Sequence, residues 1–233
     1  GGTIYFPDGT YLVSSTLIFY SNQIFKLSDN AVILRSKESN PVTRYLLAAY
    51  SEPQWSGYEG THDVVISGGI FDGNADLIEK STLVNTVHCR NIRIVGCHFR
   101  NCSMWHMIEI NSTENATVEN CVFDGEADGE SAFKECRNIE VSDCYFNLRY
   151  PFWHDVGAKI EKSELTSLCR AALWYSENIE ITDSKLHGIK ALRECGSVTM
   201  ENCDVESAEF GWFTRGLNMR DCAVKGEYFM MRS

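Results

Sequence analysis

Apolar and polar residues alternate in short runs along most of this chain. Ile92 and Ile94, Ile139 and Val141, and Ile179 and Ile181 are each separated by one charged residue. A period of two is typical of a β-strand with one buried face, and no helical spacing of convincing length interrupts these runs. The pattern therefore predicts an all-β chain.

The alternating runs belong to a repeat. The template is Asn, apolar, any, apolar, two of any, Cys, any, aromatic, and it occurs at 91–99, 115–123 and 138–146, with looser copies at 63–71, 157–165, 178–186, 197–205 and 216–224. The cysteine position falls at 69, 97, 121, 144, 163, 184, 203 and 222, so the spacing drops from 28 residues to between 19 and 24. Units of this size stack as the coils of a solenoid. We expect a single parallel β-helix domain over 1–233, with about nine or ten coils, irregular in 1–60 and regular in 61–233.

Two columns of small residues follow from this register. In the first, Ser163, Ser184 and Gly69 replace Cys, and a second column three residues before the leading apolar position holds Cys89, Thr113, Cys136, Ser176 and Cys195. Free exchange among small residues predicts inward ladders of reduced thiols rather than disulfides. The close Cys-x-x-Cys spacing of a metal site does not occur, so we expect neither metal nor cofactor. The column of Asn91, Asn115, Asn138 and Asn178 predicts turn-stabilising hydrogen bonds.

Charge narrows the range of partners. Lys and Arg number 21 and Asp and Glu 32, which gives 21 − 32 = −11, so a general nucleic-acid or anionic-membrane surface is not expected. No run reaches the roughly 20 apolar residues of a membrane helix. The sequence leaves the compartment open between the cytoplasm and export.

Two parts of the chain show family resemblances. Gly1–Val13 and Asp63–Asn74, with its Gly-Gly-Ile-Phe-Asp-Gly-Asn, resemble the pectin-lyase-like superfamily of right-handed parallel β-helices, particularly polygalacturonase-type glycoside hydrolases, over about the first 125 residues. From about Gly125, motifs at 129–133, 150–153, 170–175 and 225–229 are similar to an uncharacterised bacterial β-helix family of unknown function. Members of that family extend further at both ends, which implies that this chain is a fragment or a shortened version. The right-handed crossover rule supports the same handedness.

The polygalacturonase resemblance implies catalytic motifs on successive coils: Asn-x-Asp, Asp-Asp, Gly-His-Gly and Arg-x-Lys. In register, the first falls at 126–128, where Asp128 is kept and the Asn is replaced by Glu126. The Asp pair falls near Arg149 and the His near Arg170, and neither motif is present. Because glycoside hydrolysis needs two carboxyl groups, the resemblance implies the scaffold of these enzymes without their full catalytic set.

A first candidate site is a row of Asp72, Arg100 and Asp124 on consecutive coils. Two coils would separate the carboxyl groups by roughly 9–10 Å, near the upper end of the ~6.5–9.5 Å spacing of inverting glycosidases. Asp72, Asp124 and Asp128 are thus acid–base candidates. The alternative is that Asp-Gly marks a turn and that Arg100 forms a surface salt bridge of little energetic value.

A second candidate site is an outward row of Trp153, Trp174 and Trp212, with Lys134 and Arg193 in the same column. Stacked exposed aromatic rings would suit the apolar faces of sugars, because an outward stripe of Trp is otherwise costly. The alternative is that a loop or a partner subunit covers the stripe.

A third candidate places Arg149 above Arg170, near His154, Asp155 and Tyr175. Paired guanidinium groups would bind the carboxylate of a uronate or another acidic sugar. The alternative is that these arginines pair with Glu130, Glu135 or Glu194.

The sequence therefore predicts a carbohydrate-active β-helix protein whose partner is a polysaccharide or oligosaccharide, acting as a glycoside hydrolase or polysaccharide lyase if it is an enzyme. The competing hypothesis is a non-catalytic carbohydrate-binding module, adhesin or structural solenoid. Open coil ends would expose unpaired strand edges, so we expect further capping segments or a second copy of the chain to cover them.

Overall fold

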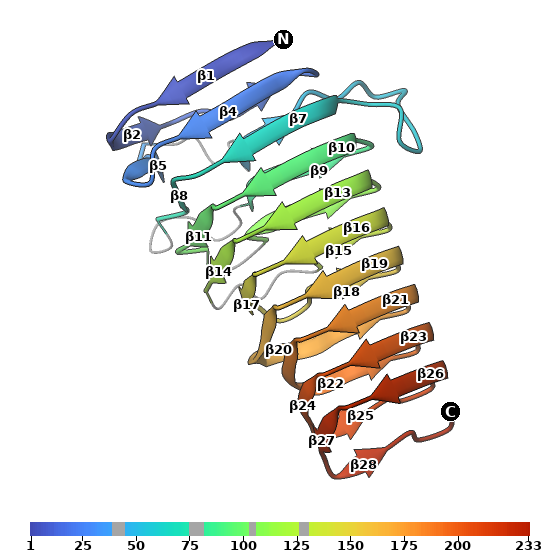
Figure 1. Cartoon of the computed structure of the whole chain (residues 1–233). Coiled ribbons are helices and arrows are strands. Elements are labelled where there is room, and N and C mark those ends of the chain that lie inside the picture. The colour runs from blue at the N-terminus through green and yellow to red at the C-terminus, as the bar shows by residue number, and fades with distance from the viewer. Residues whose placement is uncertain (39–44, 75–81, 103–105, 126–130) are drawn as a thin grey trace.

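The computed structural model describes residues 1–38, 45–74, 82–102, 106–125 and 131–233 (Figure 1). All regular secondary structure in these ranges is β-strand, and none of the described residues is helical. It follows that no described helix is long and apolar enough to cross a membrane. The prediction of an all-β chain is confirmed.

One face of the molecule is a ten-stranded parallel sheet, which we call sheet A. Each coil contributes one strand, and neighbouring strands pair in register along the whole sheet. Its strands, in order, are β1 (Gly2–Phe6), β4 (Gln23–Leu27), β7 (His62–Ser67), β10 (Arg90–Val95), β13 (Glu114–Glu119), β16 (Arg137–Ser142), β19 (Val156–Glu161), β21 (Glu177–Thr182), β23 (Gly196–Glu201) and β26 (Arg215–Arg220).

The other faces form a sixteen-stranded parallel sheet, sheet B, which has two arms. The arm that follows sheet A along the chain holds β2 (Gly9–Val13), β5 (Ala31–Arg35), β8 (Ile70–Asp72), β11 (His98–Arg100), β14 (Val122–Asp124), β17 (Tyr145–Asn147), β24 (Asp204–Ser207) and β27 (Ala223–Lys225). The returning arm holds β3 (Leu17–Phe19), β6 (Tyr45–Ala49), β9 (Thr82–Val87), β12 (Ile108–Asn111), β15 (Phe133–Lys134) and β18 (Phe152–Trp153). Two long strands, β20 (Glu164–Trp174) and β22 (Lys185–Arg193), join the arms, and β25 (Glu209–Phe210) pairs with β28 (Tyr228–Phe229).

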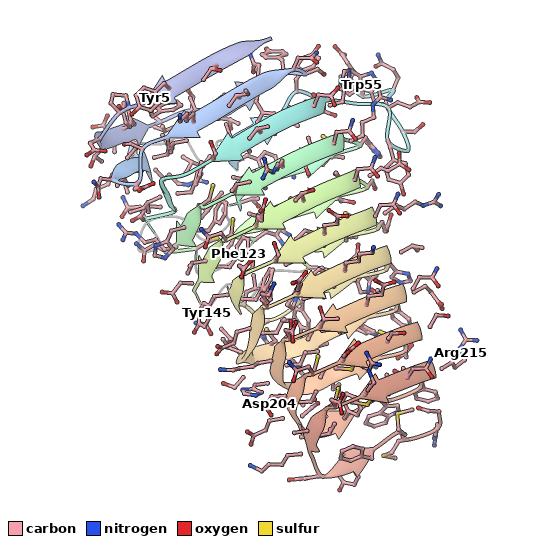
Figure 2. The ribbon with its side chains drawn as sticks, in the orientation of Figure 1. Tyr5, Trp55, Phe123, Tyr145, Asp204 and Arg215 are labelled. Carbon is pink, nitrogen blue, oxygen red and sulfur yellow. The ribbon has the colours of Figure 1, made fainter. Side chains whose placement is uncertain are left out.

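The strands wind into a parallel β-solenoid of about nine turns, with the termini at opposite ends (Figure 1). The predicted fold class is therefore confirmed. The loop between β6 and β7, which carries Trp55, projects beyond the strand ends near the first coils (Figure 2).

Rows of stacked phenylalanine fill the interior. Phe99 and Phe123 lie face to face with their ring centroids 5.0 Å apart, and Phe146 continues the stack at 4.8 Å. A second stack joins Phe133 and Phe152 at 4.8 Å. These rings are almost completely buried, so each coil contributes core area in register with the next.

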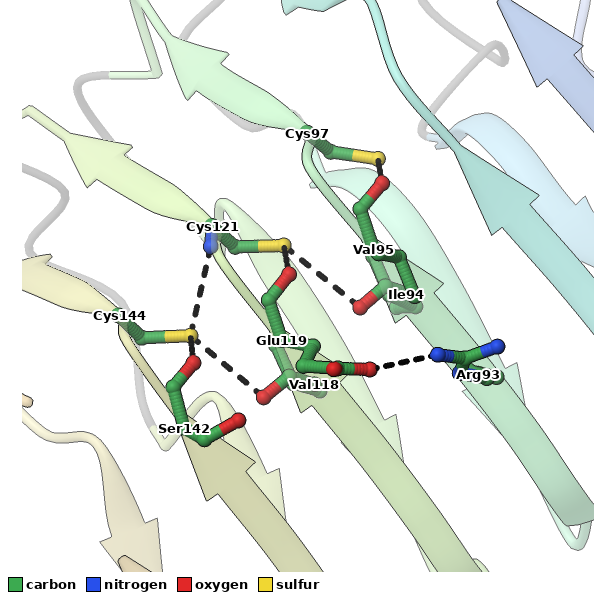
Figure 3. A network of polar contacts seen from close by, with 9 residues as sticks. All are labelled: Arg93, Ile94, Val95, Cys97, Val118, Glu119, Cys121, Ser142 and Cys144. Carbon is green, nitrogen blue, oxygen red and sulfur yellow. Dashed lines mark hydrogen bonds and ion pairs between the residues drawn. The ribbon is translucent and has the colours of Figure 1, made fainter. Parts of the chain in front are cut away.

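The first column of small residues lines the turn from sheet A to sheet B, and we call it the first turn ladder: Cys97, Cys121, Cys144, Ser163, Ser184, Cys203 and Cys222. Each side chain donates to the carbonyl two residues earlier in its own coil, as Cys121 does to Glu119 (3.3 Å; Figure 3). Ser163 donates to Glu161 in the same way (2.8 Å). Several also accept the backbone N–H of the ladder residue on the preceding coil, as Cys144 does from Cys121 (3.4 Å). A small side chain that both donates and accepts fits this position, which explains the exchange between Cys and Ser.

A second turn ladder lines the turn from sheet B back to sheet A: Cys89, Thr113, Cys136, Asp155, Ser176, Cys195 and Thr214. Most of its members follow the same rule, since Cys136 donates to Lys134 (3.4 Å) and Ser176 to Trp174 (3.2 Å). All ten cysteines of the chain are free. Burial raises the pKa of Cys89 to about 12 and that of Cys195 to about 11, so these thiols are unreactive parts of the core.

The asparagine column bonds differently from the prediction. Asn138 donates its amide to Asn115, Asn115 donates to Asn91, and Asn91 donates to the carboxylate of Asp63, at 3.1, 3.1 and 2.8 Å. Asn91, Asn115 and Asn138 have φ between 53° and 56°, a left-handed conformation that Asn tolerates. The side chains therefore hold one another across coils, in addition to allowing the turn.

Candidate functional site

The predicted aromatic row lies on the outer surface of the returning arm, next to the second turn. Strand register places Lys134 beside Trp153, Trp153 beside Trp174, Trp174 beside Arg193, and Arg193 beside Trp212. The five side chains are partly exposed. Residues separated by up to 78 positions in the sequence thus form one continuous row.

The two central indoles do not stack on each other. Trp153 meets the neighbouring His154 edge-on at 82°, whereas Trp174 lies within 18° of parallel to Tyr175. His154 and Tyr175 are themselves stacked at 24°, with centroids 4.8 Å apart. The planes of Trp153 and Trp174 are therefore steeply inclined to each other.

An open pocket of about 400 Å³ lies at these indoles, and we call it the aromatic notch. Its lining consists of Ser131, Lys134, Tyr150, Trp153 and Trp174. Ala132 and Pro151, which follow the lining residues Ser131 and Tyr150 in the chain, are buried. The notch thus offers three aromatic surfaces, the hydroxyls of Ser131 and Tyr150, and one ammonium group.

Cations lie against the aromatic rings at both ends of the notch. Lys134 Nζ is 4.7 Å from the ring centroid of Trp153, and the Arg193 guanidinium carbon is 4.6 Å from that of Trp174. On the coil beyond, Lys190 Nζ lies 5.3 Å from the Trp212 ring and 3.4 Å from a carboxylate oxygen of Glu209. These contacts help to hold the indoles in place.

A second set of aromatic residues, not anticipated from the sequence, lies at the second turn, beside the row. His154, Tyr175 and Phe213 each directly follow a Trp of the row, and all three have φ between 53° and 56°. Bulky residues rarely adopt this conformation, which costs about 1–2 kcal/mol each for L-residues. Tyr175 and Phe213 are nevertheless 38% and 40% exposed. Glu135 and Glu194 adopt the same conformation at the same turn, so it is the exposed aromatic area that marks this corner as a functional candidate.

Asp155 belongs to the second turn ladder, directly behind the notch, and is completely buried. Its Oδ1 accepts the N–H of Cys136 (2.9 Å), and its Oδ2 accepts the N–H of Trp153 (3.0 Å). Asp155, predicted to lie near Arg149 and Arg170, therefore points into the core. Its distance from the leading apolar position, three residues before Ala158, matches the second small-residue column and would have revealed its inward position.

Asp72 and Asp124, the described members of the carboxylate row, lie on the other arm of sheet B. Register places Asp72, Arg100 and Asp124 on consecutive coils, as predicted. Asp72 is almost buried, and it binds Arg100 Nε at 2.8 Å and the side-chain amide of Asn101 at 2.9 and 3.0 Å. Asp124 is exposed and accepts one long hydrogen bond from Asn147 (3.3 Å). Asp128 lies outside the described residues.

The two predicted arginine clamps lie on adjacent coils. The N–H of Ala171, which follows Arg170, donates to the carbonyl of Arg149 (3.3 Å). Arg149 is partly exposed, with its guanidinium carbon 5.6 Å from the Tyr150 ring, while Arg170 is exposed. Neither arginine lines the aromatic notch. Tyr150, which follows Arg149 in the chain, does line it. Across the described part of the chain, no three His, Cys, Asp or Glu side chains gather in a way that could hold a metal ion.

The fold is a right-handed parallel β-helix, as the sequence predicts. Among families, the model described as a protein of unknown function, DUF3737, matches residues 109–233. The chain belongs to this family.

Known proteins share the architecture at low identity. The chain is 29% identical over 164 residues to plasmin and fibronectin-binding protein A of Streptococcus pneumoniae (strain ATCC BAA-255 / R6), a match that covers 60% of this chain and 22% of that protein. It therefore spans less than a quarter of this curated relative. The crystal structure of PfbA, a surface adhesin of Streptococcus pneumoniae, superposes with a TM-score of 0.72 at 15% identity, over 96% of this chain and 71% of that one. The Family 28 exopolygalacturonase of Yersinia enterocolitica superposes with a TM-score of 0.64 at 13% identity, over 96% of this chain and 59% of that one. These structures confirm the fold.

Proposed function

We propose that this protein recognises a carbohydrate at the aromatic notch, without catalysis by the residues that line it. The observation that carries the proposal is the meeting of Trp153, Trp174 and Tyr150 around one open pocket that also presents Ser131 and Lys134. Aromatic faces pack against the apolar faces of sugar rings, while hydroxyl and ammonium groups bind sugar oxygens.

The dimensions favour a short ligand. About 400 Å³ lies in the lower part of the usual range for small-molecule sites. The lining residues come from three consecutive coils, which span about 10 Å along the solenoid axis. Trp212, which lies against Lys190 on the C-terminal side, is not among the lining residues. We therefore expect the notch to hold one or two sugar units, such as the end of a chain.

The position of the carboxylates favours binding over hydrolysis. Hydrolysis needs a proton donor and a group that activates water or attacks the sugar. None of the five described lining residues is an acid, and Asp72 and Asp124 lie on the other arm of sheet B. Asp72 is moreover held by Arg100 and Asn101.

The test is a panel of acidic and neutral oligosaccharides and polysaccharides, with binding measured by calorimetry. Trp153→Ala and Trp174→Ala are each expected to weaken binding at least about tenfold, a loss of about 1.4 kcal/mol that is typical of a central aromatic contact. Trp55→Ala is the matched control, because Trp55 packs against Tyr50 on the β6–β7 loop, away from the notch. Release of reducing ends or of unsaturated uronates from any panel member would contradict a purely binding role.

The pneumococcal relative suggests a further arm for this experiment. It is named for binding plasmin and fibronectin, so both proteins join the panel, with fibronectin before and after enzymatic removal of its glycans. Binding that survives deglycosylation and the Trp153→Ala change would favour protein recognition elsewhere on the solenoid.

A further inference from the structure

Four side chains form a closed group at the Trp174 wall of the aromatic notch. The guanidinium carbon of Arg193 lies 4.6 Å from the ring centroid of Trp174, and Arg193 Nε donates to Glu194 Oε1 at 3.0 Å. The Glu194 carboxylate also interacts with the Tyr175 hydroxyl, and Tyr175 stacks on Trp174 with ring centroids 5.3 Å apart. Each member of the group therefore contacts two of the others.

The cation of this group is compensated where it meets the indole. Arg193 brings a positive charge to the Trp174 ring, and Glu194 places a negative charge 3.0 Å from its Nε. The two side chains are 32% and 23% exposed, so water and salt screen the pair less than an ion pair on the open surface. A ligand at the Trp174 wall thus meets a neutral pair rather than a free guanidinium group.

The next indole of the aromatic row has the same arrangement. Lys190 Nζ lies 5.3 Å from the ring centroid of Trp212 and 3.4 Å from a carboxylate oxygen of Glu209. Arg193 and Glu194 are neighbours in the chain, whereas Lys190 and Glu209 belong to different strands, β22 and β25. Compensation of the cation therefore recurs along the row and is not a by-product of chain adjacency.

We propose that Glu194 is a specificity-determining residue of the notch, which neutralises Arg193 and so makes the Trp174 wall select a neutral sugar unit over an acidic one. A carboxylate of the ligand would have to compete with Glu194 for Arg193 and would lie close to a charge of its own sign. Lys134 lies against Trp153 at the other wall, so the inference concerns only the unit that contacts Trp174. The selectivity rests on the proposed function, whereas the charge at Trp174 is measurable on the protein alone.

The first test is the quenching of tryptophan fluorescence in the ligand-free protein by iodide, which is an anion, and by acrylamide, which is neutral, at constant ionic strength. Glu194→Gln keeps the size of the side chain and removes its charge, which leaves Arg193 uncompensated beside Trp174. The contribution of Trp174 is obtained by difference from Trp174→Phe in each background. Its quenching by iodide should rise at least about twofold in Glu194→Gln, while its quenching by acrylamide stays constant.

The matched control is Glu180→Gln, the same change at an acid 3.9 Å from Lys159 on sheet A, and it should keep the wild-type quenching by iodide. Unchanged quenching by iodide in Glu194→Gln would show that Glu194 does not compensate Arg193 at this wall. An equal rise with both quenchers would show that the indole has become more exposed rather than more positive in its surroundings. Either result overturns the proposal.

The ligand test uses whichever saccharide of the panel binds, in two forms of equal length, with its C6 groups as hydroxymethyl or oxidised to carboxylate. The wild type should bind the neutral form more tightly. The ratio of the acidic to the neutral affinity should rise at least about threefold in Glu194→Gln and stay at the wild-type value in Glu180→Gln.

A wild type that prefers the acidic form, or a Glu194→Gln protein in which both affinities change equally, contradicts the selectivity. Absence of any binding saccharide would instead defeat the proposed function and the selectivity with it, while the quenching by iodide would still decide whether Glu194 compensates Arg193.

Discussion

The two turn ladders of this solenoid have the same backbone design and different surroundings. At the first turn, the left-handed position outside the ladder is held by polar or charged residues, including Asn120, Asp143, Lys162 and Asp183. At the second turn, the same kind of position holds polar residues on some coils, such as Glu135 and Glu194, and the aromatic His154, Tyr175 and Phe213 on others, and the ladder behind it contains an acid. Asn and Asp suit left-handed turns, whereas bulky aromatic residues do not. The second turn thus departs from the most stable solution that the first turn displays, and such departures are expected at functional sites.

The largest expected loss of stability comes from introducing an aspartate into the first turn ladder. Cys121→Asp should destabilise the fold by more than about 3 kcal/mol in urea unfolding at neutral pH, because Cys121 lies between Cys97 and Cys144 in a core position without a functional role. Cys121→Ser should stay within about 1 kcal/mol of the wild type, since the hydroxyl repeats the donor role of Ser163. A well-tolerated Cys121→Asp would abolish the distinction between the turns.

The next effect is the pH dependence of stability that Asp155 imposes. Its pKa rises from an ordinary 3.8 to about 8 on folding, so between these values the folded chain keeps a proton that the unfolded chain has lost. The free energy of unfolding should therefore fall as pH increases, by up to about 1.4 kcal/mol per pH unit, and level off above pH 8. Urea unfolding series at several pH values should show this slope in the wild type and a reduced slope in Asp155→Ser. Parallel slopes would mean that Asp155 is ionised in the folded chain at neutral pH.

The smallest effect concerns the asparagine ladder that follows the second turn. Gly157 interrupts it between Asn138 and Asn178, with φ of 75°, and a Cβ added there would lie in tight contact with Asn138 Oδ1, at 3.3 Å. Gly157→Asn should extend the amide chain after a small shift of Asn138 and stabilise the fold by about 0.5 kcal/mol in the same assay. Gly157→Ala adds the Cβ without the amide and should not stabilise. A gain shared by both variants would show that backbone entropy, not the amide chain, is responsible.

The repeat made the fold predictable, because a fixed register converts sequence spacing directly into rows of neighbours. Strand pairing between Trp153 and Trp174, and between Asp72, Arg100 and Asp124, follows from counting along the template. The notch was less predictable. Its wall residue Tyr150 and its buried hydroxyl Ser131 lie in the segments between strands, where the template sets no position. Ring orientation is likewise set by contacts with His154 and Tyr175, which spacing alone does not encode.

The hydrogen bonds of the turn ladders have a direction that bears on how the chain is assembled. The amide of Cys121 is satisfied by the side chain of Cys144, and that of Cys144 by Ser163, always one coil later. During synthesis from the N-terminus, the turns of these coils therefore keep an unpaired backbone N–H until the following coil has folded against them. The coil formed last therefore has the fewest of its turn hydrogen bonds, and each further coil supplies the acceptor for the one before it.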